Sequence, residues 1–336
     1  MAVAILTHEA FPDRAKTAVG LLRYGDREVR ALVDRERAGQ RVHDALPDVQ
    51  DAPIVASMAD APEVDALVIG ISPIGGEFDE SWREDVRTAL ERGCDVYAGL
   101  HDFLADDEEF ARLAAEHDAA LHDLRKPPED LTVAAGTASD VDATVITTVG
   151  TDCSTGKMTA SFEIRDAARE RGLDAAVVPT GQTGIAISDH GIVIDRVIAD
   201  YAAGAVERLV EEAQAADLLV VEGQGALAHP AYSGVTTSIL HGSAPDALVM
   251  CHEAGREVIH GYESFDIPPL SEYVDIYERL AAPISDASVV AGMLNTRHLG
   301  DSEAADAVSG YSNALDAPAT DPVRHGVPDE VLDAIL

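Results

Sequence analysis

Gly150-Thr-Asp-Cys-Ser-Thr-Gly-Lys-Met-Thr159 is the segment from which the fold class of this chain follows. It comes after the β-branched run 143–149, which predicts a buried strand, and before a helical pattern over residues 157–171. A glycine-bearing loop in that position presents backbone N–H groups, a helix N-terminus and a lysine ammonium to phosphate oxygens. We therefore predict a phosphate-binding loop, whose cofactor contacts are Gly150, Thr151, Asp152, Cys153, Ser154, Thr155, Gly156, Lys157, Met158 and Thr159.

The loop departs from the common phosphate-binding pattern at two points. Five residues rather than four separate Gly150 from Gly156, and Met158 occupies the position of the serine or threonine that binds magnesium. Thr159, one residue later, could take over that ligand. The alternative is an ordinary tight turn with an incidental lysine. Because the whole chain contains only three lysines, we favour a catalytic and binding role for Lys157.

A second acidic and glycine-bearing segment follows further along the chain. Asp217-Leu-Leu-Val-Val-Glu222 predicts a buried strand that ends in a carboxylate. In a parallel sheet this end lies at the same edge as the phosphate-binding loop, where an acid can hold Mg²⁺ directly or through water. We predict that Glu222 is catalytic and that Glu222 and Thr159 are metal ligands. An acid that only terminates a strand is the alternative.

Polar side chains also follow the predicted strand 175–178. Since ligands bind at the carboxyl edge of an open α/β sheet, we predict that Thr180, Gln182 and Thr183 contact the substrate. An ordinary polar loop explains them equally well.

Three single residues near later strand ends could carry chemistry. His229 could accept a proton from an attacking amine, Arg256 could bind a substrate carboxylate, and Asn295 could pair with the edge of a purine. Capping, turn formation or a surface position is the alternative for each. The spacing of the nearby histidines matches no usual zinc pattern, so we predict no zinc site. A helix N-terminus would favour a Cys153 thiolate, but a small structural residue is the preferred interpretation.

The alternation of strand-length apolar runs with helical patterns predicts an α/β fold with parallel sheets. In the N-terminal part, strands are expected at 3–6, 29–33, 66–71 and 95–98, with helices at 16–24 and 81–92. We expect an N-terminal domain over residues 1–130, a linker over 131–142 and a C-terminal domain over 143–336. No G-x-G-x-x-G follows the first strand, so the N-terminal domain lacks the sequence signature of dinucleotide binding.

The chain is strongly acidic: 61 Asp and Glu against 24 Lys and Arg give a formal net charge of −37. Nucleic-acid backbones and anionic membrane surfaces would be repelled, so neither is expected as a partner. Excess carboxylate is typical of proteins from a salt-rich, halophilic cytoplasm. Three cysteines without a C-x-x-C motif favour a reducing compartment. The N-terminus has no leader pattern, and we expect a cytoplasmic protein.

Four segments together resemble a known family: residues 150–159, Val221-Glu-Gly-Gln-Gly225, His229-Pro-Ala-Tyr-Ser-Gly-Val-Thr236, and His241-Gly-Ser-Ala-Pro-Asp246 leading into Cys251-His-Glu-Ala-Gly-Arg256. The chain resembles the D-glutamate N-acetyltransferase (DgcN-like) family over nearly its whole length. The resemblance implies an N-terminal Rossmann-like domain and a C-terminal P-loop domain, and it implies a functional link to amino-acid or dipeptide epimerases. A homo-oligomer is also expected.

A more distant resemblance connects Gly150-Thr-Asp, Gly156-Lys157 and Val221-Glu-Gly223 to dethiobiotin synthetase. It implies a three-layer α/β P-loop domain in which the loop binds ATP and the acid binds magnesium. In that family a threonine follows the lysine, and Met158 departs from it.

The two resemblances imply different reactions. Acetyl-CoA carries a pyrophosphate and a 3′-phosphate that the loop could hold as readily as it could hold ATP. The favoured prediction is acetyl transfer from acetyl-CoA to the amino group of D-glutamate or a similar acidic amino acid. The alternatives are an ATP- and Mg²⁺-dependent activating enzyme and a nucleotide-binding accessory protein of an epimerase.

Overall fold

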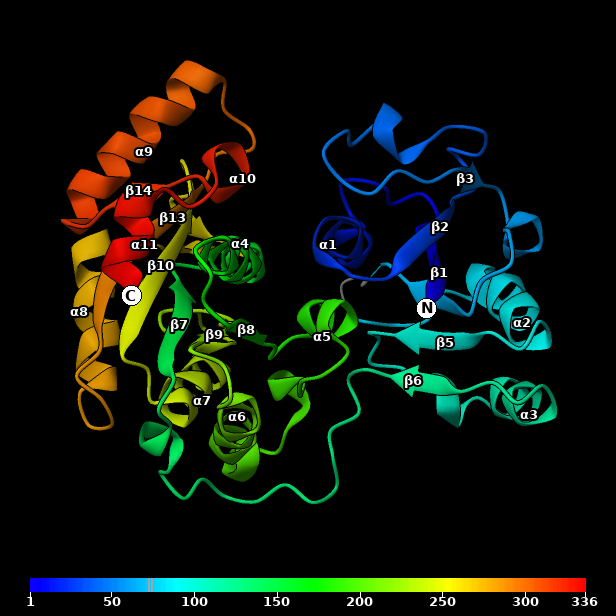
Figure 1. The fold of residues 1–336 in the computed structure, drawn as a ribbon, viewed down its shortest axis with the longest axis horizontal. Helices are drawn as coiled ribbons and strands as arrows, with labels where there is room; N and C mark the ends of the chain where they lie inside the picture. The colour runs from blue at the N-terminus through cyan, green and yellow to red at the C-terminus, as the bar shows by residue number, and fades with distance from the viewer. Residues whose placement is uncertain (72, 74) are drawn as a thin grey trace. The chain divides into compact units, whose positions relative to one another are not determined.

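The computed structural model describes residues 1–71, 73 and 75–336 and divides the chain into two compact units (Figure 1). The first unit combines Met1–Pro127 with Gln182–Val193, and the second combines Pro128–Gly181 with Ile194–Leu336. The sequence pattern does not predict that 182–193 would join the first unit. The segment does so because α5 (Gln182–Ser188) packs on α1 (Lys16–Tyr24).

The first unit contains a parallel six-stranded sheet in the order β3-β2-β1-β4-β5-β6, which is the order of a Rossmann fold. The four strands expected from the sequence are confirmed. The edge strands β3 and β6 are too short to leave a pattern in the sequence. The remaining elements are β1 (Ala2–Leu6), β2 (Glu28–Val33), β3 (Ile54–Val55), β4 (Ala66–Ile69), α2 (Arg83–Glu91), β5 (Asp95–Ala98), α3 (Glu108–Glu116) and β6 (Leu121–Asp123).

Asp34 occupies the end of β2, where the acid that binds a ribose lies in dinucleotide-binding proteins. Its carboxylate is buried and accepts N–H groups from Glu9, at 3.3 Å, and Glu36, at 3.1 Å. The Thr7 hydroxyl donates to it as well. This acid therefore holds the local loops together.

The second unit contains a parallel sheet in the order β14-β13-β10-β7-β9-β8, beside which lies a separate antiparallel hairpin, β11–β12. The expected α/β class is confirmed. The strands and helices are β7 (Thr144–Gly150), α4 (Lys157–Glu170), β8 (Ala175–Val178), α6 (Ala199–Ala213), β9 (Leu218–Val221), α7 (Ser233–Ser243), β10 (Ala247–Glu253), β11 (Val258–Ile259), β12 (Tyr262–Asp266), α8 (Leu270–Ala281), β13 (Ser288–Asn295), α9 (Asp301–Leu315), β14 (Ala319–Thr320), α10 (Pro322–His325) and α11 (Asp329–Ile335).

Helices cover both faces of this second sheet and give it three layers. On one face, Ile164 of α4 and Leu332 of α11 pack against Ile146 and Val220. On the other face, residues of α7, α8 and α9 surround Leu248 and Met250. Because all six strands are parallel, their carboxyl ends meet at one edge, where the phosphate-binding loop begins.

Residues 131–142, expected to form a linker, belong to the second unit and are held against α6. The buried carboxylate of Glu207 accepts N–H groups from Ala135, Gly136 and Thr137 at 2.6 to 2.8 Å. Gly204 allows this approach, because a Cβ there would lie 2.1 Å from the Thr132 carbonyl oxygen. The segment is thus fixed by hydrogen bonds to a buried charge.

Candidate functional site

The loop after β7 has the backbone of an anion-binding turn. Gly150 ends β7, and Gly156, with a φ of 104°, directly precedes α4. Ser154 also has a left-handed φ of 57°. Such alternation turns successive N–H groups toward one side, and the N-terminus of α4 adds its positive partial charge. The segment predicted to bind phosphate therefore has a suitable backbone.

Lys157 lies inside this loop and is buried. Its Nζ donates to the Asp152 carbonyl oxygen at 2.7 Å. Two glycines make room for it: a Cβ on Gly150 would lie 3.1 Å from Nζ, and a Cβ on Gly223 would lie 3.2 Å from Cδ and 1.8 Å from the Thr148 carbonyl oxygen. The ammonium is thus positioned over the loop, as a phosphate ligand requires.

The Asp152 side chain is the centre of the loop's hydrogen bonds. It is fully buried, and Oδ1 accepts the Cys153 N–H at 2.7 Å. Oδ2 accepts a hydrogen bond from Arg256 at 2.9 Å and another from the His260 N–H at 2.8 Å. Arg256 also donates to the Cys153 carbonyl oxygen at 2.7 Å and pairs with Glu253. In this arrangement Arg256 braces the loop, and its contact with substrate remains a prediction.

Two tyrosines of α8 hold the start of the loop and were missed by the sequence analysis. Tyr277 donates to the Gly150 carbonyl oxygen at 2.8 Å, and Tyr273 donates to the Thr151 carbonyl oxygen at 2.7 Å. Burial raises the pKa of both phenols, so they remain protonated donors. Their i, i+4 spacing places them on one face of the helix, which is the available sequence signal.

His252 adds a further brace at the end of β10. Its Nδ1 lies 2.7 Å from the Thr151 Oγ1. Burial, assisted by the charge of Arg256, lowers the pKa of His252 to about 4. The ring is therefore neutral at physiological pH and acts as a hydrogen-bonding partner.

Glu222 follows β9 and is buried next to the loop carrying Thr180. Its Oε2 accepts the N–H groups of Thr180 and Gly181, both at 3.3 Å. Thr159 instead lines a pocket with residues of β13 and α10, on the other side of β7 in the sheet order. Glu222 is not among the residues that line this pocket, and buried Met158 offers magnesium no oxygen. The roles of Thr159 and Glu222 as metal ligands remain predictions.

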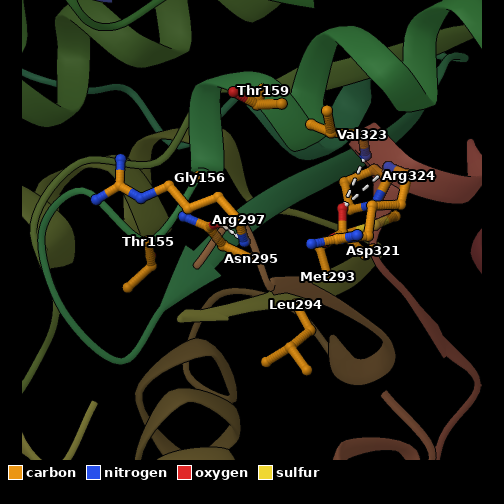
Figure 2. Close-up of a pocket in the computed structure, with 11 residues that line it drawn as sticks. Thr155, Gly156, Thr159, Met293, Leu294, Asn295, Arg297, Asp321, Val323 and Arg324 are labelled. Atoms are coloured by element: carbon orange, nitrogen blue, oxygen red, sulfur yellow. Dashed lines mark hydrogen bonds and ion pairs between the residues drawn. The ribbon is translucent and has the colours of Figure 1, made fainter. Parts of the chain in front are cut away.

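A pocket of about 370 Å³ opens beside the N-terminus of α4 (Figure 2). Asn295 lies in its wall, and its contact with a cofactor remains a prediction. Its Oδ1 accepts the Arg297 N–H at 3.2 Å, which leaves the amide NH₂ group as the donor it can offer to a ligand. The lining residues are Thr155, Gly156, Thr159, Met293, Leu294, Asn295, Arg297, Asp321, Pro322, Val323 and Arg324.

The far wall of this pocket was not predicted. Asp321 caps α10 by accepting the N–H groups of Val323 and Arg324 at 3.0 and 3.2 Å, and Pro322 occupies the first turn. Arg324 donates to Thr296 Oγ1 at 2.9 Å and so ties α10 to the end of β13. An aspartate followed by proline is a helix-start signal that could have indicated this wall.

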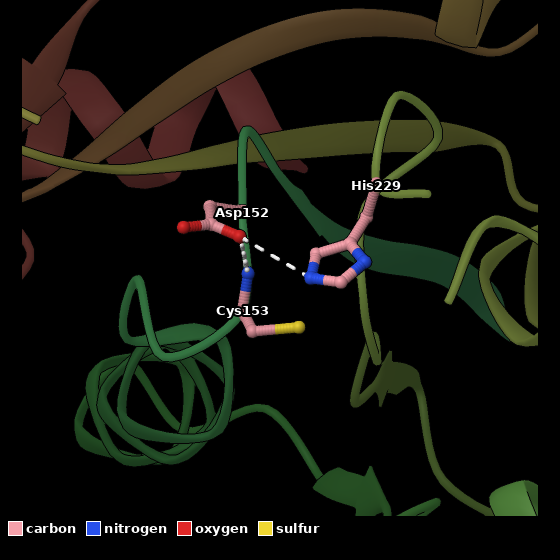
Figure 3. A group of neighbouring side chains, drawn as sticks. All are labelled: Asp152, Cys153 and His229. Atoms are coloured by element: carbon pink, nitrogen blue, oxygen red, sulfur yellow. Dashed lines mark hydrogen bonds and ion pairs between the residues drawn. The ribbon is translucent and has the colours of Figure 1, made fainter. Parts of the chain in front are cut away.

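His229 approaches the loop from the segment between β9 and α7 and is buried (Figure 3). Its Nε2 lies 3.9 Å from Asp152 Oδ1, and Cys153 Sγ belongs to the same group of side chains. Tyr232 and Tyr262 flank the imidazole with ring centroids 4.6 and 5.1 Å away. Burial lowers the pKa of His229. The negative charge of Asp152 opposes this shift, and the positive charge of Lys157 adds to it.

Two predicted substrate contacts lie in the other unit. Gln182 and Thr183 begin α5, and Thr183 Oγ1 lies 2.9 Å from Thr17 Oγ1 of α1. Their contact with substrate remains a prediction. No helix in the described part of the chain is long and apolar enough to cross a bilayer.

Comparisons with known proteins agree with this architecture. Residues 132–332 match the P-loop domain of the DUF1611 family, described as a domain of unknown function, and residues 35–127 match its Rossmann-like N-terminal domain. A DUF1611 protein from Anabaena variabilis, known from a crystal structure, superposes with a TM-score of 0.93 and 37% identity, covering 99% of this chain and 98% of that one.

Two curated relatives are described as D-glutamate N-acetyltransferase. One, from Tritonibacter scottomollicae, is 37% identical over 270 residues, which are 80% of each chain. The other, from a Pseudoalteromonas species, is 36% identical over 264 residues, which are 78% of each chain. With both domain matches and these relatives, the chain belongs to the DUF1611 family, which joins a Rossmann-like domain to a P-loop domain.

Proposed function

We propose that this protein transfers the acetyl group of acetyl-CoA to the amino group of D-glutamate or a similar acidic amino acid. The observation that carries the proposal is the identity of 36 and 37% to two D-glutamate N-acetyltransferases over about four fifths of the chain. The matches extend over 270 and 264 residues, more than the length of the P-loop domain at 132–332, so the activity of these relatives is the first to test.

The described residues suit the phosphorylated part of coenzyme A. Gly156 at the start of α4 and the Lys157 ammonium would hold phosphate oxygens. The adjoining pocket has apolar walls and the Asn295 amide, which suits an adenine ring. Arg297 on the same pocket is 70% exposed and could reach a 3′-phosphate. Acetyl-CoA would supply an activated thioester that needs no metal.

An ATP-dependent activating enzyme is the second candidate, because Glu222 ends the strand next to the phosphate-binding loop. Two observations oppose it. Met158 is buried at the usual position of the magnesium ligand, and Thr159 faces the pocket on the side of β13. We therefore prefer acetyl transfer, which requires no metal between these residues.

Calorimetric titration separates the two candidates. We expect acetyl-CoA to bind in the presence of EDTA. Arg297→Ala should weaken the binding of acetyl-CoA more than it weakens the binding of dephospho-acetyl-CoA. Tight binding of ATP–Mg²⁺ with no binding of acetyl-CoA would favour the activating enzyme. Lys16 is an exposed lysine on α1, and Lys16→Ala is the control for loss of positive charge.

A further inference from the structure

The two ring nitrogens of His229 have different roles. Nδ1 accepts the N–H of Ala231 at 3.1 Å. A neutral imidazole carries one proton, so a ring that accepts at Nδ1 carries its proton on Nε2. Since the pKa of His229 is lowered by burial, this neutral form prevails near pH 7. His229 therefore presents an N–H group to the loop.

Among the described residues, no carboxylate oxygen lies within hydrogen-bond distance of this N–H. The His229 side chain is 1% exposed, and the carboxylate oxygen nearest to Nε2, Asp152 Oδ1, is 3.9 Å away, beyond hydrogen-bond distance. In Figure 3 the Nε2 end of the ring points toward Asp152 and Cys153 at the start of the loop. An N–H group in this position can donate to an oxygen of a bound ligand.

A metal ion does not suit this position, although Asp152, Cys153 and His229 offer ligand atoms within 4.8 Å of one another. A metal on Nε2 would require the proton on Nδ1, where it would oppose the Ala231 N–H. The Asp152 oxygens already accept hydrogen bonds from Cys153, Arg256 and His260. An oxygen of an organic ligand is the better partner for Nε2.

We propose that His229 donates its Nε2–H to the carbonyl oxygen of the acetyl thioester and does not act as a general base. This inference rests on the proposed acetyl transfer. The amine nitrogen forms the new C–N bond, the C–S bond breaks, and the proton lost by the amine ends on the departing thiolate to give the thiol of CoA. His229 keeps its proton and stabilises the negative charge that develops on the carbonyl oxygen.

The surroundings favour a carbonyl over a phosphate at Nε2. The Asp152 carboxylate, 3.9 Å away, would repel a phosphate dianion, whereas a thioester oxygen is neutral before the attack. Arg256, bound to Asp152 at 2.9 Å, offsets that carboxylate as charge develops. A carboxylate of the amino-acid substrate is the other oxygen that could use this donor, and the kinetics distinguish the two.

The test compares His229→Gln with His229→Ala. Glutamine can place an N–H near the position of Nε2 but cannot accept a proton near pH 7. We expect kcat to fall roughly 10²–10³-fold in His229→Ala, the usual effect of losing an oxyanion donor, and to stay within about tenfold of the original in His229→Gln. The KM for D-glutamate should be unchanged in both. His117→Gln, at an exposed position after α3, is the control.

Four results would overturn the inference. If His229→Gln is as slow as His229→Ala while both remain folded, His229 is a base. If kcat is retained and the KM for D-glutamate rises, Nε2 binds the amino acid instead. A ¹⁵N spectrum of the unmodified protein that shows the His229 proton on Nδ1 would also refute it, whatever the variants do. If the unmodified protein transfers no acetyl group, the proposed function and this inference fail together.

Discussion

The ammonium of Lys157 is hydrogen bonded, at 2.7 Å, to the backbone carbonyl of Asp152 within the same loop. Phosphate oxygens would therefore approach a lysine that is already buried and positioned. Because we propose that the charge of Lys157 contacts the ligand, we expect Lys157→Ala to abolish binding of acetyl-CoA in calorimetry, with little change in the melting temperature. Lys16→Ala should bind normally. Unchanged affinity of Lys157→Ala for every phosphate-bearing ligand would contradict the loop assignment.

Magnesium should not be required for acetyl transfer. Glu222 accepts two backbone N–H groups, and Thr159 lines a pocket that does not include Glu222. We expect the rate of thiol release from acetyl-CoA to be the same in EDTA and in excess Mg²⁺. If activity is lost in EDTA and restored by Mg²⁺, the prediction that Glu222 and Thr159 are metal ligands is favoured instead.

His252 should make the protein less stable in acid. Its pKa of about 4 in the folded chain lies below the ordinary value near 6.5, so the unfolded chain binds the proton first as the pH falls. Stability is therefore lost between pH 6.5 and 4, by up to about 3 kcal/mol in the unfolding free energy. Urea denaturation at both pH values should show a smaller loss in His252→Asn, whose amide can still bond Thr151. Equal losses in both proteins would refute this assignment.

Salt should stabilise the chain. A formal net charge of −37 produces self-repulsion that ions screen. Screening also weakens surface ion pairs such as Arg208–Asp130, but exposed pairs contribute little. We expect the melting temperature to rise steeply between about 0.1 and 2 M KCl. A flat profile in scanning calorimetry would contradict a halophilic adaptation.

The sequence predicts the strand and the helix around the phosphate-binding loop well and the surrounding elements poorly. The strand before Gly150 and the helix from Lys157 are strong local patterns, and both are present. Asn295 lines the pocket because a residue at the carboxyl end of a parallel strand lies near that edge. Local periodicity carries this information.

The missed features depend on tertiary packing. Tyr273 and Tyr277 contact the loop from a helix more than a hundred residues later, and their role follows only from how α8 packs. The strand β14 has two residues, too few for a pattern. Likewise, Gln182 and Thr183 follow a predicted strand, yet the contact of α5 with α1 places them in the first unit.

The most direct test of acetyl transfer is the release of free thiol from acetyl-CoA with D-glutamate as acceptor, in EDTA, at high salt and without ATP. The account predicts that thiol appears in proportion to enzyme and that N-acetyl-D-glutamate forms in equal amount. L-glutamate and a blank without acceptor measure selectivity and background hydrolysis. If thiol release never exceeds the blank while ATP–Mg²⁺ is consumed in the presence of an acidic amino acid, acetyl transfer is wrong.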